Sequence, residues 1–287
     1  MKLSVVVPVY NEQDNISLFV TTVIPHLASV TKDYEIIFAC DPSQDSTWDF
    51  IGAYHSMYPE IKAVLLSRRF GQPMAALAGL AVANGDLVVV MDVDLQDPPS
   101  MIPTMIEKAR EGFDVVYAKR SSRDGDSWIY RLFAWMGYRL LWRMAEVRIP
   151  HNVGDFRLMS RRVVDELLAM KESHGFLRGM TALVGFRQAS VEFERPARLR
   201  GKTHYSRVWG SLKIGLNGLF CFSRTPLLFI FWAGALTLGS CPFFRRLDLF
   251  LSGVILLALW TLGEYIGRIY EEVKNRPKFI IQERLGL

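Results

Sequence analysis

Short apolar runs rich in β-branched residues alternate with segments of helical periodicity along the first 118 residues, and this alternation constrains the fold more than any other feature. Strands that alternate with helices pair in parallel through right-handed crossovers, which places helices on both faces of the sheet. We therefore predict an α/β fold with a doubly wound, mainly parallel sheet. The predicted strands are Leu3–Val9, Tyr34–Ala39, Ile61–Leu66, Leu87–Met91 and Asp114–Ala118, and the clearest helices between them are Asn15–Val30 and Pro73–Ala83.

Polar segments follow the first four predicted strands. Their sequences are PVYNE, CDPSQD, LSRRFG and DVDLQD. In a doubly wound sheet the carboxyl ends of the parallel strands meet at one edge, and ligands bind beyond that edge. The sequence therefore predicts that four separate segments converge on one binding site.

The stretch VVVMDVDLQDPP, residues 88–99, concentrates carboxylates directly after a buried strand. Neighbouring carboxylates repel one another unless a cation or a hydrogen-bonding ligand lies among them. Asp94 and Gln96 offer the hard oxygen ligands that Mg²⁺ or Mn²⁺ prefers. Because the protein would supply only two or three ligands, coordination positions would stay open for a diphosphate. A DxD pair is a short pattern, so a solvated acidic loop is the alternative.

The composition excludes several classes of function. The net charge is only +5 and no tract of like charges is present, which argues against nucleic acid as a partner. Cys40, Cys221 and Cys241 are odd in number and lack CxxC spacing, so we expect neither a disulfide framework nor a zinc site. The apolar run at the N-terminus is too short, and too soon interrupted by Pro8, to be a signal peptide.

Two apolar stretches near the C-terminus predict membrane-spanning helices. Pro226–Phe244 has 19 residues without a charge, and Leu249–Gly263 adds 15 more. We expect a hairpin of about 226–244 and 247–270 whose basic flanks lie in the cytoplasm, although two arginines in the turn oppose the positive-inside rule. A helical hairpin buried within the protein is the alternative.

Two further segments combine aromatic and basic residues at helical spacing. One begins at Trp128 and carries Arg131, and the other is Ser206–Phe222. Such helices lie in a membrane interface or, alternatively, pack as ordinary amphipathic helices, because arginine stems also cover apolar surface in soluble proteins.

Several long motifs, which run in order over almost the whole chain, include VVPVYNEQDNI, FGQPMAALAGLAVANGD, MDVDLQDPPSMI, GDFRLMSRRVVDEL and LGEYIGRIYEEVKNRPKFI. In these motifs the chain resembles glycosyltransferase family 2, and within it the polyprenyl-phosphate branch of bactoprenol-phosphate glucosyltransferases and dolichol-phosphate-mannose synthases. Together with the apolar stretches, the resemblance implies a GT-A catalytic domain over 1–205, a juxtamembrane amphipathic helix over 206–225, a transmembrane hairpin over 226–270 and a cytoplasmic tail over 271–287.

The same resemblance implies an activity. It is the inverting, metal-dependent transfer of a sugar from a nucleotide-diphosphate sugar to a polyprenyl phosphate lipid, with UDP-glucose as donor, undecaprenyl phosphate as acceptor and Mg²⁺ or Mn²⁺ as cofactor. The implied role is the modification of cell-surface glycan or lipopolysaccharide. The implied location is the bacterial inner (plasma) membrane, as a multi-pass protein with a cytoplasmic catalytic domain, and the implied assembly is a homo-oligomer such as a tetramer.

The resemblance also assigns residues to the donor site. The residues expected to bind the nucleotide sugar are Pro8, Tyr10, Glu12, Asp41, Asp92 and Asp94. Tyr10 would place its ring near the base and Asp41 would accept a hydrogen bond from uracil, whereas Asp45 is expected only to cap a turn. Asp94 and Gln96 would hold the metal.

A second group of residues is assigned to the acceptor. The residues expected near the lipid phosphate are Arg120, Arg131, Arg198 and His204. Asp155 in GDFR is assigned, with Asp94, to catalysis, where Asp155 would orient or deprotonate the lipid phosphate; the alternative is a cap on a helix that follows it. Arg157, like Arg123 and Arg200, is expected to form a surface salt bridge.

Three positions depart from the family pattern: Cys40 replaces an acid, Arg69 replaces an asparagine before FG, and His204 replaces a lysine. They leave two alternatives open. One is the same reaction with another donor, such as GDP-mannose, UDP-GlcNAc or a UDP-aminoarabinose derivative. The other is a catalytically silent, membrane-tethered protein that binds a nucleotide sugar. A processive polysaccharide synthase is disfavoured because the sequence contains no QxxRW motif.

Overall fold

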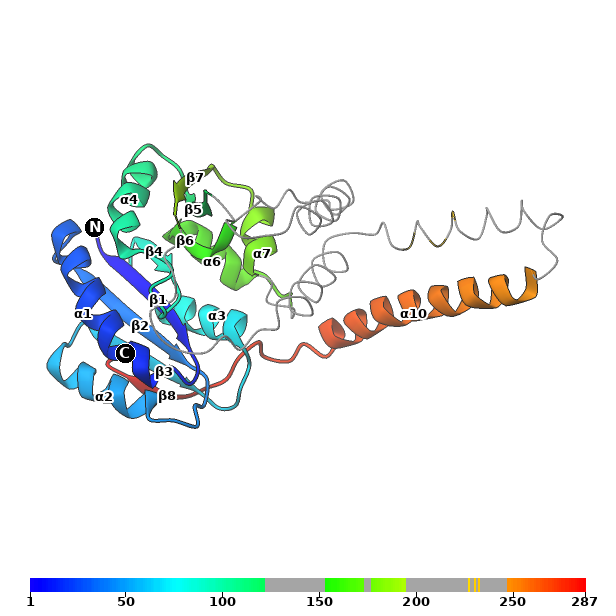
Figure 1. The fold of residues 1–287 in the computed structure, drawn as a ribbon, viewed down its shortest axis with the longest axis horizontal. Helices are drawn as coiled ribbons and strands as arrows, with labels where there is room; N and C mark the ends of the chain where they lie inside the picture. Colours follow the sequence, from blue (N-terminus) through cyan, green and yellow to red (C-terminus); the bar gives the residue numbers. More distant parts are fainter. Residues whose placement is uncertain (122–152, 173–176, 195–226, 228–229, 231, 233–246) are drawn as a thin grey trace.

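A computed structural model of the chain describes residues 1–121, 153–172, 177–194, 227, 230, 232 and 247–287. Within these residues an eight-stranded sheet, in the order β7-β5-β6-β4-β1-β2-β3-β8, lies between two layers of helices (Figure 1). The strands are β1 (Leu3–Val9), β2 (Tyr34–Cys40), β3 (Ile61–Leu66), β4 (Leu87–Val90), β5 (Val115–Arg120), β6 (Val153–Ser160), β7 (Gln188–Phe193) and β8 (Ile281–Leu285). The helices are α1 (Gln13–Val30), α2 (Thr47–Met57), α3 (Gln72–Val82), the 3₁₀ helix η1 (Pro99–Met101), α4 (Ile102–Arg110), α6 (Arg161–Ala169), α7 (Leu177–Leu183) and α10 (Leu247–Val273).

The predicted parallel core is confirmed, because β4, β1, β2 and β3 pair side by side in parallel. Every residue of β1 is buried. Val5 and Val7 belong to the core cluster that includes α1, whereas Val6 belongs to the one that includes α3 and α6. Burial on both faces explains why these strands are continuous apolar runs in the sequence rather than alternating ones.

Strands β6 and β7 were not predicted from the sequence. β6 runs antiparallel to both of its neighbours, β4 and β5, and Val90 of β4 lies opposite Arg157 of β6. As a consequence, the amino end of β6 lies at the edge of the sheet where the parallel strands end. We call this the carboxyl edge. Asp155 therefore lies at the same edge as the predicted acidic segment.

Helix α3 approaches β1 so closely that one of its residues has to be glycine. A Cβ atom on Gly79 would lie 2.4 Å from Val6 Cγ1 and 3.3 Å from Ala39 Cβ. Neither neighbour can move away without shifting a strand, because both are fully buried in the central sheet.

We expect Gly79→Ala to lower the free energy of unfolding by about 1–3 kcal/mol, the usual cost of overpacking a core. The matched control is Gly52→Ala in α2, where a Cβ would meet nothing within 4 Å. That change should stabilise the helix by about 0.5–1 kcal/mol, because alanine has the higher helix propensity. Denaturant unfolding of the purified proteins measures both values, and equal effects of the two changes would contradict the predicted close contact.

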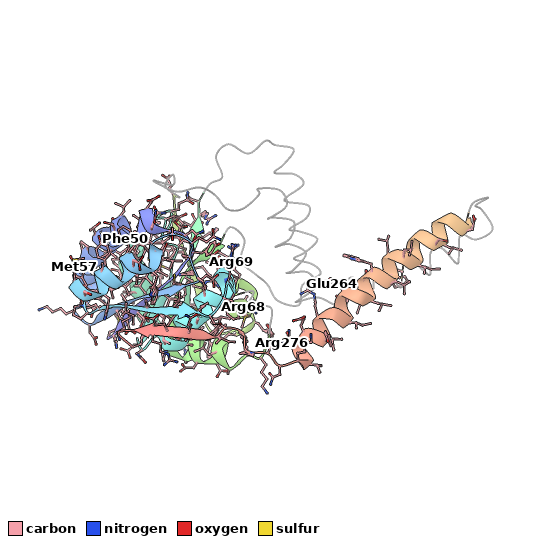
Figure 2. All side chains as sticks on the ribbon, turned by 90° about the horizontal axis from the view of Figure 1, so that it is seen from below. Phe50, Met57, Arg68, Arg69, Glu264 and Arg276 are labelled. Carbon is pink, nitrogen blue, oxygen red and sulfur yellow. The ribbon has the colours of Figure 1, made fainter. Side chains whose placement is uncertain are left out.

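The C-terminal helix α10 is exposed and apolar. Its segment Leu251–Val273, 23 residues long, has the length and composition to cross a membrane, and 6% of its most apolar stretch is buried. The alternative of a helix buried within the protein is therefore wrong for α10, which extends away from the sheet (Figure 2). The other half of the expected hairpin, 226–244, lies almost wholly outside the described residues, as does the juxtamembrane segment 206–225. The described residues therefore contain one candidate span, and the hairpin stays a prediction.

The expected tail, 271–287, does not lie apart from the catalytic domain. Its last residues form β8, which pairs antiparallel with β3 at the edge of the sheet. The backbone N–H of Ser67 donates to Ile280 O at 2.9 Å, and Phe279 packs against the core. The C-terminal end of α10 is therefore held close to the catalytic domain. The basic residues of the connecting segment are Lys274, Arg276 and Lys278.

Candidate active site

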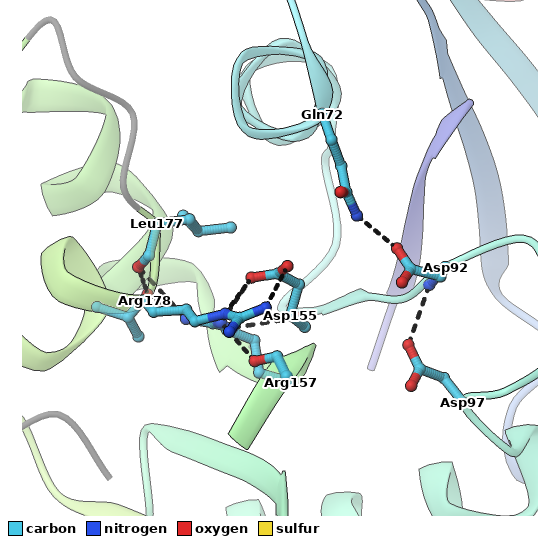
Figure 3. A network of polar contacts seen from close by, with 9 residues as sticks. Gln72, Asp92, Asp97, Asp155, Arg157, Leu177 and Arg178 are labelled. Atoms are coloured by element: carbon cyan, nitrogen blue, oxygen red, sulfur yellow. Dashed lines mark hydrogen bonds and ion pairs between the residues drawn. The ribbon is translucent and has the colours of Figure 1, made fainter. Parts of the chain in front are cut away.

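The loops that follow the parallel strands hydrogen-bond to one another at the carboxyl edge, as predicted. The loop after β2 contacts the loop after β1, where Gln44 N donates to Asn11 Oδ1 at 2.7 Å. The first residue of α3 contacts the loop after β4, where Gln72 Nε2 donates to Asp92 Oδ1 at 2.7 Å (Figure 3). Segments from separate crossovers are thus hydrogen-bonded to one another at this edge.

Asp41 holds the loop between β3 and α3 in place. One of its oxygens accepts the backbone N–H of Phe70 at 3.0 Å, and the other accepts the N–H of Gly71 at 2.8 Å. Gly71 has φ of +91°, a left-handed conformation that glycine adopts without strain. Asp41 therefore has a structural role that the sequence did not reveal, and its contact with uracil stays a prediction.

The other residues assigned to the donor differ in their accessibility. Pro8 is buried inside β1, and the half-buried Tyr10 follows the end of that strand. The guanidinium carbon of Arg69 lies 4.0 Å from the centre of the Tyr10 ring, a cation–π distance. Glu12 Oε2 accepts a hydrogen bond from Asn15 Nδ2 at 2.6 Å. Arg69, one of the departures from the family pattern, thus lies directly on the ring expected near the base.

Cys40 and Asp45 have structural surroundings: Cys40 is a buried thiol and Asp45 caps a turn. Burial raises the pKa of the Cys40 thiol to about 11, so it stays neutral at the position where the family has an acid. Asp45 Oδ1 accepts hydrogen bonds from both the backbone N–H and the hydroxyl of Thr47, at 3.1 and 2.5 Å. The predicted turn-capping role of Asp45 is confirmed.

The acidic segment after β4 folds into a compact turn. Asp94 Oδ1 accepts the backbone N–H of Gln96 at 3.1 Å, and Asp97 Oδ2 accepts the N–H of Asp92 at 3.2 Å. Leu95, between the two predicted metal ligands, has φ of +56°, which is uncommon for a residue that is not glycine. Such conformations persist where the surrounding structure enforces them, and they cluster at functional sites.

The electrostatics of this turn fit a divalent cation. The pKa of Asp92 is raised well above its usual range, first by burial and then by repulsion from Asp97, Asp155 and Asp94. A bound cation would relieve that repulsion. Among the described residues no three His, Cys, Asp or Glu side chains already form a ligand cluster. Asp94 and Gln96 offer oxygen atoms of the kind that Mg²⁺ binds, and their role as metal ligands stays a prediction.

Asp155 faces this turn and is paired with arginine. Arg178 donates to it in a fork, from Nε to Oδ1 at 3.0 Å and from Nη2 to Oδ2 at 3.0 Å (Figure 3). Arg157 Nη2 adds a longer contact to Oδ1 at 3.3 Å. The helix-cap alternative is wrong, because Asp155 lies inside β6 and the next helix begins at Arg161.

The charge state of Asp155 bears on its role. Burial alone would raise its pKa, but the charge and hydrogen bonds of Arg178, followed by the charges of Arg157 and Arg120, outweigh burial and hold the pKa below its usual value. A carboxylate with a lowered pKa is ionised at neutral pH and is a weak proton acceptor. Of the two roles expected from the sequence, these surroundings favour orienting a substrate over deprotonating it.

Arg157 is not a surface residue, so the expectation of a surface salt bridge is wrong. Its side chain is fully buried. It donates to Gly154 O at 2.9 Å, to Thr181 Oγ1 at 2.9 Å and to Leu177 O at 3.3 Å. The bonds to Leu177 and Thr181 join β6 to α7, the helix that carries Arg178. Arg178 was not predicted from the sequence, because no local motif marks a partner 23 positions after Asp155.

Of the residues assigned to the acceptor, the structure describes Arg120 alone. It ends β5 at the carboxyl edge, where its charge acts on Asp155. Arg131, Arg198 and His204 lie outside the described residues, together with Arg123 and Arg200. Their roles stay predictions.

A mainly parallel α/β sheet, with an acidic turn at its carboxyl edge opposite a carboxylate–arginine pair, is typical of a GT-A-like glycosyltransferase fold. Residues 4–168, more than half of the chain, match the family model described as Glycosyl transferase family 2. The chain therefore belongs to glycosyltransferase family 2, and it is an enzyme of that class.

Relatives match along the full length. A bactoprenol glucosyl transferase derived from prophage SfII of Shigella flexneri is 40% identical over 304 positions, which cover 99% of this chain and 98% of that protein. An uncharacterized glycosyltransferase of Synechocystis sp. is 39% identical over 100% of this chain and 96% of that protein. In fold, the chain is similar to mannosyl-3-phosphoglycerate synthase from Rubrobacter xylanophilus, with a TM-score of 0.52 at 16% identity over 76% of this chain and 71% of that one.

Proposed function

We propose that the protein transfers glucose from UDP-glucose to undecaprenyl phosphate at the cytoplasmic face of the bacterial inner membrane. The observation that carries this proposal is the end-to-end match, at 40% identity, to a protein named bactoprenol glucosyl transferase. Bactoprenol is a polyprenyl lipid, and an exposed apolar helix such as α10 suits an enzyme whose acceptor resides in a membrane.

On the donor side, the acidic turn would receive the diphosphate. Asp94 and Gln96 would hold Mg²⁺ or Mn²⁺, which when bound neutralises charge on the departing diphosphate. Gln72 fixes the orientation of Asp92 through its hydrogen bond of 2.7 Å. Tyr10 and Arg69 provide a ring and a cation beside the expected position of the base.

On the acceptor side, a phosphate oxygen of the lipid attacks the anomeric carbon of the sugar. The bond from that carbon to the lipid phosphate forms as its bond to UDP breaks on the opposite face, so the configuration inverts. The phosphate is already anionic near neutral pH, so Asp155 serves to orient charged groups around it. Positioning of the two substrates supplies most of the rate acceleration.

The C-terminal region would set the orientation of the enzyme in the membrane. Because β8 joins the catalytic sheet, the end of α10 at Val273 lies on the side of the catalytic domain. The basic residues that follow it support a cytoplasmic position for that side, because positive charge favours the cytoplasmic face of a membrane. A homo-oligomer, such as a tetramer, stays a prediction.

A transfer assay tests the proposal. Purified full-length protein, radiolabelled UDP-glucose, undecaprenyl phosphate and Mg²⁺ or Mn²⁺ should yield a chloroform-soluble labelled lipid, whose mass identifies one added hexose. Excess EDTA should abolish the product and added metal should restore it. Transfer only from GDP-mannose, UDP-GlcNAc or a UDP-aminoarabinose derivative would overturn the donor assignment. Failure with every donor while UDP-glucose still binds would favour a silent binding protein.

A further inference from the structure

Two arginines, Arg157 and Arg178, form ion pairs with the Asp155 carboxylate, and they differ in their exposure. The Arg157 side chain is 0% exposed. It is held by three protein oxygens besides Asp155. The Arg178 side chain is 30% exposed and that of Asp155 is 28% exposed, so their ion pair is open to a ligand. Of the two arginines that pair with Asp155, Arg178 is therefore the one that a substrate can contact.

In Figure 3 the Asp155 carboxylate lies between the Arg178 guanidinium and Asp92 of the acidic turn. A group bound to Arg178 would face the position proposed for the diphosphate. This is where the attacking oxygen of an acceptor has to lie.

We propose, on the basis of the proposed function, that Arg178 binds the phosphate of the lipid acceptor and exchanges the Asp155 carboxylate for it. The guanidinium fork that now holds both carboxylate oxygens at 3.0 Å suits two phosphate oxygens equally well. A phosphate carries more negative charge than a carboxylate, so it competes effectively for the fork.

The exchange leaves no carboxylate without a partner. Asp155 Oδ1 keeps its contact with Arg157 Nη2 at 3.3 Å when Arg178 leaves. This matters because a partly buried carboxylate that lost every partner would destabilise the protein. Arg157 is thus a positioning residue, since it compensates Asp155 and holds α7 through Leu177 and Thr181.

The test compares Arg178→Gln and Arg178→Lys with the wild type in the transfer assay, with both substrates varied. Arg178→Gln should raise the KM for undecaprenyl phosphate about 10- to 100-fold, the effect of losing hydrogen bonds to a charged group, and change the KM for UDP-glucose less than about twofold. Arg178→Lys should recover part of the loss, because it keeps the charge without the fork. Binding of farnesyl phosphate, a short soluble polyprenyl phosphate, measured by calorimetry without donor, should weaken in the same order.

The matched control is Arg162→Gln, which removes another arginine fork, the one on Asp114, at the opposite end of β6. It should leave both KM values unchanged. The inference is overturned if Arg178→Gln lowers kcat or stability while the lipid KM and farnesyl phosphate binding stay at wild-type values, or if the wild type binds no farnesyl phosphate. If farnesyl phosphate binds through Arg178 but no sugar is transferred, the inference holds and the proposed function fails.

Discussion

Replacement of Asp94 by asparagine should reduce sugar transfer by at least about 10³-fold, the scale of several kcal/mol of charge stabilisation by a metal. Asparagine keeps an oxygen that can accept the Gln96 N–H, which now lies 3.1 Å from Asp94 Oδ1, so the turn should keep its shape. The change removes one negative charge where the metal is proposed to bind. Activity should therefore fall without a comparable loss of stability, and Mn²⁺ binding measured by electron paramagnetic resonance should weaken.

The control for this prediction is Asp86→Asn. Asp86 precedes the same strand, β4, at its opposite end, where its side chain is 70% exposed and accepts the backbone N–H of Lys2 at 2.8 Å. This variant should transfer sugar at the wild-type rate. Full activity of Asp94→Asn, or wild-type turnover in excess EDTA, would show that the reaction does not require a metal at this site.

Replacement of Glu35 by alanine should lower the free energy of unfolding by about 3–5 kcal/mol, the usual cost of breaking a buried ion pair. The Glu35 side chain is 1% exposed, and Lys62 Nζ lies 2.9 Å from it. Its other oxygen accepts the Ser4 hydroxyl at 2.6 Å and the Asn84 N–H at 2.8 Å. Alanine leaves all three donors without this acceptor at the end of the sheet remote from the active site, so stability should fall in denaturant unfolding.

This stabilisation should depend on pH in a defined direction. Burial alone would raise the pKa of Glu35, but the hydrogen bonds from Lys62, Ser4 and the Asn84 N–H lower it below its usual value. A group whose pKa is lower in the folded state stabilises above its unfolded pKa, about 4.3 for glutamate, and loses that effect as the pH falls through the folded pKa. The difference between wild type and Glu35→Ala should therefore be largest near neutral pH and shrink below about pH 4.

The comparison for Glu35 is Glu192→Ala. Glu192 also pairs with a lysine, Lys119, at 2.7 Å, but its side chain is 60% exposed. Exposed ion pairs contribute little, so this change should cost less than about 1 kcal/mol. Similar losses for the two variants would show that burial does not set the strength of the Glu35 network.

The C-terminal strand illustrates a limit of sequence patterns. IQERL carries two charges in five residues and gives no apolar alternation long enough to predict a strand. β8 forms because the edge of β3 is available for pairing and Phe279 packs on the core beside it. Both conditions depend on the assembled sheet, so a tail was the natural expectation from the sequence alone.

The parallel core and the acidic turn at its edge could be predicted from the residues alone. Burial on both faces demands continuous apolar runs, so β1 and β3 have the bounds that their composition predicts, and the carboxylates after β4 follow directly in the chain. The antiparallel direction of β6 beside β4, the position of Asp155 opposite the acidic turn and its pairing with Arg178 emerge only in the folded chain. The reason is physical: hydrophobic periodicity reports burial near a residue, whereas strand direction and ion pairing depend on segments that meet only when the chain has folded.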